Sequence, residues 1–128
     1  MPRQIIATSQ APAAVGPYSQ AVRAGDFMYL SAQLPLDPVT GTLVRSGVRA
    51  QTRRTIENVR AVMEGAGATL AHIVRTTLFI RNMDDFGQIN DVYAEFFPGD
   101  KPARSTVEVA RLPKDAALAL DAIAYLGS

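Results

Sequence analysis

Two segments with helical periodicity interrupt a chain of short strand-like segments, and this alternation constrains the fold more than any other feature. From Gly47 to Ala66, apolar residues recur at three- and four-residue steps, which predicts an amphipathic helix. Asp84 is a natural N-cap for a second helix that runs to Phe97. Its apolar stripe consists of Phe86, Ile89, Tyr93 and Phe96. On the first helix we expect ion pairs at i,i+4 spacing between Arg53 and Glu57 and between Arg60 and Glu64.

Six further segments are expected to form strands: Ile5–Thr8, Ser19–Arg23, Phe27–Gln33, Ile73–Arg81, Ser105–Ala110 and Leu118–Tyr125. Alternation in the third predicts one face with Phe27, Tyr29, Ser31 and Gln33, and the other with Met28, Leu30 and Ala32. The order β-β-β-α-β-α-β-β predicts an α+β fold, one sheet with both helices on a single face. We expect residues 1–128 to form a single domain whose other sheet face is buried in a homo-oligomer.

Composition excludes several classes of site. The 13 basic and 12 acidic residues nearly cancel, which argues against a nucleic-acid-binding protein. The absence of cysteine excludes thiol catalysis and disulfides, and the single histidine, His72, excludes a paired-histidine metal motif. The apolar run among the first residues is too short for a signal peptide, and no stretch is long enough for a membrane span. We therefore expect a cytoplasmic protein with no bound metal and no membrane partner.

Arg104 is the first candidate for a ligand contact. It follows Pro102-Ala103 and shares the polar face of its strand with Thr106 and Glu108, while Val107 and Val109 alternate with them. Its planar guanidinium is suited to bidentate binding of a carboxylate. The alternative is a surface arginine paired with Glu108 or Asp121, and the pattern alone leaves both open.

Three other polar residues have weaker claims. Tyr18, after Gly16-Pro17, could close a pocket with its ring, or be a half-buried aromatic at a strand start. Ser31 lies in a strand beside large hydrophobic residues, and Asn90 lies at the edge of the second helical stripe. Neither position requires a function. His72 is expected in the turn before the next strand.

Taken together, the motifs resemble the RidA/YjgF family from Ile6 to about Ala124. The matching segments appear in the family's order. They are Gly16-Pro17-Tyr18-Ser19-Gln20-Ala21, Ser31-Ala32-Gln33-Leu34-Pro35, Gln51-Thr52 with Glu57-Asn58-Val59, Val74-Arg75-Thr76-Thr77-Leu78-Phe79, Asp85-Phe86 with Asn90, Tyr93 and Phe96-Phe97, and Pro102–Leu112.

The resemblance implies a chorismate-mutase-like fold that forms a homotrimer around a central barrel, with three clefts between neighbouring subunits. It also implies hydrolysis of reactive enamine/imine acids to 2-oxo acids and ammonia, without a cofactor. By similarity, Arg104 and the backbone near Thr106 would bind the small carboxylate ligand, a 2-imino or 2-oxo acid. Tyr18, Ser31 and Asn90 would line the cleft, which orients the imine carbon toward water.

The chain departs from the family in the last strand. Relatives carry a glutamate that orients the attacking water, where this chain has Ala119, and only a second acid remains, as Asp121. Loss of a positioned general acid/base costs about 10²–10⁴-fold in rate. Asp121 would be a doubtful substitute, because it lies one pleat repeat away, roughly 6.5–7 Å. Ala32 replaces a usual glycine, and Thr106 a frequent cysteine.

Three functions follow from these features. The leading hypothesis is a deaminase of 2-imino acids such as 2-iminopropanoate and 2-iminobutanoate, weakened by Ala119. The second is a non-catalytic trimer that binds small carboxylates. The third is a ribonuclease, which the near-neutral charge and the lone histidine disfavour.

Overall fold

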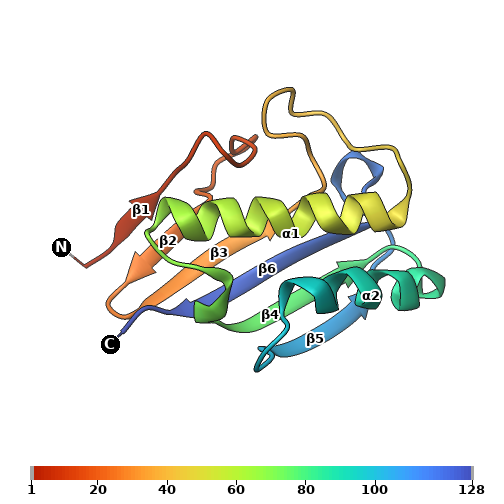
Figure 1. Cartoon of the computed structure of the whole chain (residues 1–128). Helices are drawn as coiled ribbons and strands as arrows, with labels where there is room; N and C mark the ends of the chain where they lie inside the picture. Colours follow the sequence, from red (N-terminus) through yellow and green to blue (C-terminus); the bar gives the residue numbers. More distant parts are fainter. Residues whose placement is uncertain (1, 128) are drawn as a thin grey trace.

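The computed structural model describes residues 2–127, and these form a mixed sheet of six strands and two α-helices (Figure 1). The strands are β1 (Gln4–Ile6), β2 (Ala21–Ala24), β3 (Phe27–Gln33), β4 (Ile73–Ile80), β5 (Ala103–Glu108) and β6 (Leu118–Tyr125). The helices are α1 (Val48–Gly65) and α2 (Phe86–Phe96). Three short 3-10 turns, η1 (Leu70–His72), η2 (Met83–Asp85) and η3 (Pro113–Asp115), complete the chain order. The predicted α+β architecture is confirmed.

The sheet has the strand order β1-β2-β3-β6-β4-β5. Its neighbours pair antiparallel except for β4 and β5, which are parallel because α2 forms the crossover between them. The last strand in sequence, β6, therefore lies in the middle of the sheet, and β5 lies at its edge. Figure 1 shows α1 and α2 side by side over the same sheet face.

The core lies between the helices and that face. Ile56, Val59, Val62 and Met63 of α1 are fully buried, and they pack with alternate residues of the central strands, Leu78, Ile80, Leu118, Leu120, Ala122 and Ala124. The helix ends after Gly65, and Gly67 adopts a φ of +75° so that Ala68 N–H can reach the Met63 carbonyl at 3.0 Å. The opposite face carries exposed aromatic side chains, with Phe27, Tyr29 and Tyr125 between 40% and 48% exposed.

Several local predictions were wrong. Asp84 is not the helix cap, because it belongs to η2, where the side chain of Asn82 accepts its backbone N–H at 2.9 Å, and α2 begins only at Phe86. The alternation of β3 does not continue to its end. A register shift between Leu30 and Gln33 places Gln33 on the buried face, so it does not lie with Phe27 and Tyr29. The same shift exposes Ala32, which the alternation had placed with the buried Met28 and Leu30.

The predicted ion pairs along α1 do not form as expected. Arg53 pairs with Glu95 of α2 at 3.0 Å, and Glu57 accepts contacts from Arg54 at 3.5 Å and Arg60 at 3.9 Å. The second helix lies alongside α1 and offers Arg53 a better-placed carboxylate than its own helix does. The expected turn at His72 is confirmed, and its Nδ1 accepts the Thr69 N–H at 3.1 Å.

Candidate functional site

A cavity of about 480 Å³ opens on the sheet face that the helices leave uncovered. Its walls come from the loop before β2, the end of β3, the end of β4, the loop before β6 and the start of β6. Four predicted site residues line it: Tyr18, Ser31, Ala32 and Ala119. The other lining residues are Val15, Leu34, Phe79, Leu112 and Pro113. The structure thus brings together predicted residues that range from position 18 to position 119 of the sequence.

Buried hydrogen bonds hold the two segments that carry Tyr18 and Ser31. The Gln20 amide, 5% exposed, donates to the carbonyls of Thr8, Ala11 and Pro12 and accepts the Thr8 N–H. The hydroxyl of Ser31 donates to the Ser19 carbonyl at 2.6 Å. Because these bonds fix the loop before β2, the ring of Tyr18 has a defined place at the cavity wall.

The loop between β5 and β6 forms the remaining wall through Leu112 and Pro113. Lys114 and Asp115 adopt positive φ angles of 57° and 63°, a conformation that costs energy for residues other than glycine. Arg81 holds this turn, with its guanidinium 3.2 Å from the Asp115 carboxylate and 3.0 Å from the Asp115 carbonyl oxygen. The strained turn is thereby fixed beside the cavity.

The cavity lining has no carboxylate. Ala119 presents only a methyl group, and Asp121 is absent from the cavity wall. The Asp121 carboxylate instead accepts the backbone N–H of Thr77 at 3.0 Å. The polar atoms available in this lining are therefore the hydroxyls of Tyr18 and Ser31 and backbone groups.

Arg104 lies elsewhere, on the helix-covered side of the sheet. The parallel register pairs Arg104 with Thr76, and Thr76 is fully buried beneath the helices, so the two share that face. The guanidinium carbon is 4.7 Å from the ring centre of Tyr93 and 5.5 Å from that of Phe86. Such cation–π contacts stabilise a fixed arginine by about 0.5–2 kcal/mol.

Tyr93, the inner of the two rings, is itself held in place. Its hydroxyl is 2.9 Å from the Thr76 hydroxyl, and the side chain is 6% exposed. Burial raises the pKa of the Tyr93 phenol above its ordinary value, although the bond to Thr76 and the charge of Arg104 lower it. The phenol is therefore neutral at pH 7, and its ring face is available to the cation.

Asn90 lies on the same helix face as the rings that contact Arg104, and Thr106 lies on the same strand face as Arg104. Asn90 follows Phe86 by four positions and precedes Tyr93 by three, which places it on the same row of α2. Thr106 is two residues after Arg104 and shares its strand face. Because β5 is the edge strand, its outer row of backbone groups has no strand partner among residues 2–127.

The alternative ion pairs of Arg104 do not form. Glu108 accepts the Met83 N–H at 2.7 Å, and Asp121 is occupied by Thr77. Within residues 2–127, no carboxylate lies within 4.0 Å of the Arg104 guanidinium. The predicted site residues therefore form two groups on opposite sides of the sheet. Arg104, Asn90 and Thr106 form the arginine group, and Tyr18, Ser31, Ala32 and Ala119 form the cavity group.

The described residues contain no cluster of three or more histidine, aspartate or glutamate side chains that could hold a metal ion. In the same part of the chain, neither helix is long and apolar enough to cross a membrane.

Comparisons with known proteins agree on one family. The family model described as "Endoribonuclease L-PSP" matches residues 8–126. A 2-iminobutanoate/2-iminopropanoate deaminase from Salmonella typhimurium is 48% identical over 122 residues, which cover 93% of this chain and 94% of that protein.

Two solved structures extend the comparison. TdcF from E. coli with bound serine is 42% identical, with a TM-score of 0.93, and the match covers 97% of this chain and 99% of that one. The YjgF gene product of E. coli is 45% identical, with a TM-score of 0.91, over 95% of this chain and 98% of that one. The chain therefore belongs to the RidA/YjgF family.

Proposed function

We propose that this protein hydrolyses reactive 2-imino and enamine acids, of the 2-iminopropanoate and 2-iminobutanoate type, to 2-oxo acids and ammonia. The observation that carries the proposal is Arg104, a guanidinium fixed over two aromatic rings and free of any carboxylate among the described residues. An ordered cation without an anionic partner is suited to bind the carboxylate of a small ligand. The similarity to the Salmonella deaminase supports the same reaction.

We further propose that residues 1–128 form one RidA-like domain with a chorismate-mutase-like fold, and that three copies assemble around a central barrel. Within one chain, Arg104 and Ala119 lie on opposite sheet faces, and β4 separates their strands. Two strand spacings amount to roughly 10 Å, too far for one imino acid to touch both groups. The arginine group of one subunit and the cavity group of its neighbour would form a complete cleft.

The exposed aromatic side chains support this assembly. Phe27, Tyr29 and Tyr125 lie on the uncovered sheet face and are 40–48% exposed in the single chain. Large apolar patches of this kind on a small domain mark interaction surfaces. Burial between subunits would remove them from water and enclose the cavity.

The reaction needs few groups. Arg104 would bind the substrate carboxylate in a bidentate manner, and Tyr18 would hold the planar imine against the cavity wall. An enamine first tautomerises to the imine. Water then adds to C2 and forms a C–O bond while one of its protons passes to the imine nitrogen, which gives a carbinolamine. The C–N bond breaks as the hydroxyl proton passes to nitrogen, so that ammonia leaves and the C=O bond of the 2-oxo acid forms. No cofactor takes part in this sequence.

The second candidate is a non-catalytic trimer that binds small carboxylates, and Ala119 favours it. The cavity offers no proton-transfer group at the position of the family's glutamate, and Asp121 already accepts a hydrogen bond from the sheet. A rate reduction of about 10²–10⁴-fold is expected from that loss. A ribonuclease function has the least support, because the lone His72 lies at a turn and caps Thr69.

The test generates 2-iminopropanoate and 2-iminobutanoate enzymatically and traps the surviving imine with semicarbazide. The deaminase proposal expects this protein to lower the trapped yield, and Arg104→Ala to abolish the effect. Arg53→Ala is the matched control, because Arg53 also lies over an aromatic ring, Phe96, but far along the outer helix surface. An unchanged trapped yield at high protein concentration would contradict deaminase activity. Unchanged binding of pyruvate to Arg104→Ala would contradict the assigned site.

A further inference from the structure

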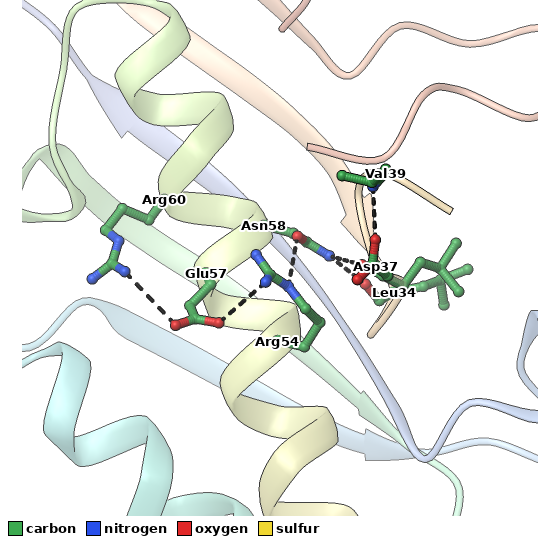
Figure 2. A network of polar contacts seen from close by, with 8 residues as sticks. Leu34, Asp37, Val39, Arg54, Glu57, Asn58 and Arg60 are labelled. Atoms are coloured by element: carbon green, nitrogen blue, oxygen red, sulfur yellow. Dashed lines mark hydrogen bonds and ion pairs between the residues drawn. The ribbon is translucent and has the colours of Figure 1, made fainter. Parts of the chain in front are cut away.

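A buried asparagine outside the two groups fixes the chain segment that leaves β3 (Figure 2). Asn58 lies in the middle of α1 and is fully buried. Its side-chain NH₂ donates to the carbonyls of Leu34 at 3.0 Å and Leu36 at 2.9 Å. These carbonyls lie beyond the end of β3, so the sheet ladder does not hold them. Asn58 therefore links α1 directly to the backbone of this segment.

The amide of Asn58 has one orientation only. Its oxygen accepts the Nε–H of Arg54 at 3.1 Å, and Arg54 is in turn 3.5 Å from Glu57 (Figure 2). A guanidinium can only donate, and a backbone carbonyl can only accept. A reversed amide would place its oxygen against two carbonyl oxygens and its NH₂ against a donor. The Leu34 and Leu36 carbonyls and the Arg54 guanidinium therefore all favour the same orientation of Asn58, and Arg54 holds its oxygen.

The held segment is stiff. The Leu34 carbonyl also accepts the Leu36 N–H at 2.8 Å, which makes a tight turn around Pro35. The Asp37 carboxylate accepts the N–H groups of Val39 at 2.8 Å and Thr40 at 3.0 Å. A displacement at the Leu34 carbonyl therefore moves the segment as a unit.

The segment contributes Leu34 to the candidate cavity. Leu34 stands there with Ala32, Phe79 and Leu112, so the wall beside Tyr18 is apolar. In the proposed cleft, a carboxylate held by Arg104 of the neighbouring subunit would leave the rest of a 2-imino acid to contact this wall. Its position then decides how large an apolar side chain the cleft accepts.

We propose that Asn58 is a positioning residue for ligand selectivity, which acts through the Leu34 carbonyl and is held in place by the hydrogen bond from Arg54. The inference rests on the proposed function, since it takes the cavity as the place of the ligand's side chain. A purely structural role would weaken the binding of all ligands alike. A positioning role changes the ratio between a ligand that reaches Leu34 and one that does not.

The experiment measures the affinities of two stable 2-oxo acids, pyruvate and 4-methyl-2-oxopentanoate, by calorimetry. Asn58→Asp removes the NH₂ donors and keeps the side-chain size. We expect the affinity for 4-methyl-2-oxopentanoate, divided by the affinity for pyruvate, to fall by about tenfold. This is the low end of the discrimination that one methylene group gives in an apolar pocket. Arg54→Ala should change the ratio in the same direction by less, and Arg53→Ala, one position away, should not change it.

A double-mutant cycle tests whether the effect of Asn58 on the ligand is transmitted through Leu34. Because Asn58 acts through Leu34, the change caused by Asn58→Asp should vanish in a Leu34→Ala background. An additive effect of the two substitutions, or equal weakening of both ligands, would overturn the inference. Binding of neither ligand to the wild type would instead contradict the proposed function.

A measurement that needs no ligand distinguishes a failure of the positioning role from a failure of the proposed function. The methyl resonances of Leu34 should shift in folded Arg54→Ala, which leaves the buried amide in place, and not in Arg53→Ala. Unchanged Leu34 signals in that variant would overturn the positioning role whatever the protein binds. The Leu34 methyl shifts also test the positioning role if the Asn58→Asp variant does not fold.

Discussion

The replacement Ala119→Glu tests most directly whether the cavity is an incomplete active site. The Ala119 methyl group lies in the wall of a cavity of about 480 Å³, together with Tyr18 and Ser31. A glutamate at this position would place a carboxylate beside the proposed imine carbon. Nothing else in the cavity lining can take a proton from the attacking water, so the new group would have no competitor there.

The expected gain is limited by how well the new carboxylate is held. A positioned general acid/base contributes about 10²–10⁴-fold. The Ser31 hydroxyl already donates to the Ser19 carbonyl, so the Tyr18 hydroxyl is the one side-chain donor in the lining not committed in this way. With a single donor to orient it, the glutamate should raise kcat/KM by about 10- to 100-fold, the lower part of that scale.

The assay is semicarbazide trapping with enzymatically generated 2-iminobutanoate, and Ala119→Gln is the control. Glutamine has almost the same size but no proton-transfer group. Equal activity of the two folded variants would refute the reasoning, because any gain would then come from filling the cavity. A gain with glutamate alone would show that the rest of the site is competent.

Two further predictions concern charge. Arg104→Lys keeps the positive charge but loses the planar guanidinium and its stacking on Tyr93. Calorimetry should therefore find that this variant binds pyruvate about tenfold more weakly than the wild type. Equal affinity would contradict the role of the stacked guanidinium in carboxylate binding. The N–H groups of Thr40 and Val39 hold the pKa of Asp37 below its ordinary 3.8. The ionised carboxylate therefore stabilises the fold above that value, and its contribution is lost as pH falls through the lowered pKa. The Tm difference between wild type and Asp37→Ala should be full above about pH 5 and shrink below about pH 4, whereas a constant difference would contradict this assignment.

The architecture was predictable because periodicity reports which face of an element is buried. The apolar steps of Ile56, Val59, Val62 and Met63 located α1 to within a residue at each end. Alternation also placed Arg104 and Thr106 correctly on one strand face. The alternating pattern could not predict that this face lies under the edge of α2, because that depends on β5 being the edge strand of the sheet.

The wrong placement of Gln33 and the unpredicted role of Asn58 have local causes. The register shift in β3 turns Gln33 inward, and an alternating pattern gives no signal for one extra residue. Asn58 was visible only as part of a family motif. A polar residue within the buried stripe of α1, one position before Val59, is the signal that could have marked it, since a buried amide needs partners. Its partners, the Leu34 and Leu36 carbonyls, follow from the fold and not from the helix pattern.

The location of Arg104 and the cavity group on opposite sides of one sheet has a genetic consequence. If each cleft takes Arg104 from one subunit and the cavity from the next, two inactive variants damaged in different groups can complement each other. After unfolding and refolding Arg104→Ala together with a cavity variant in equal amounts, about one quarter of the clefts would combine two intact groups. Two mutant alleles expressed in one cell would then restore an activity that neither provides alone.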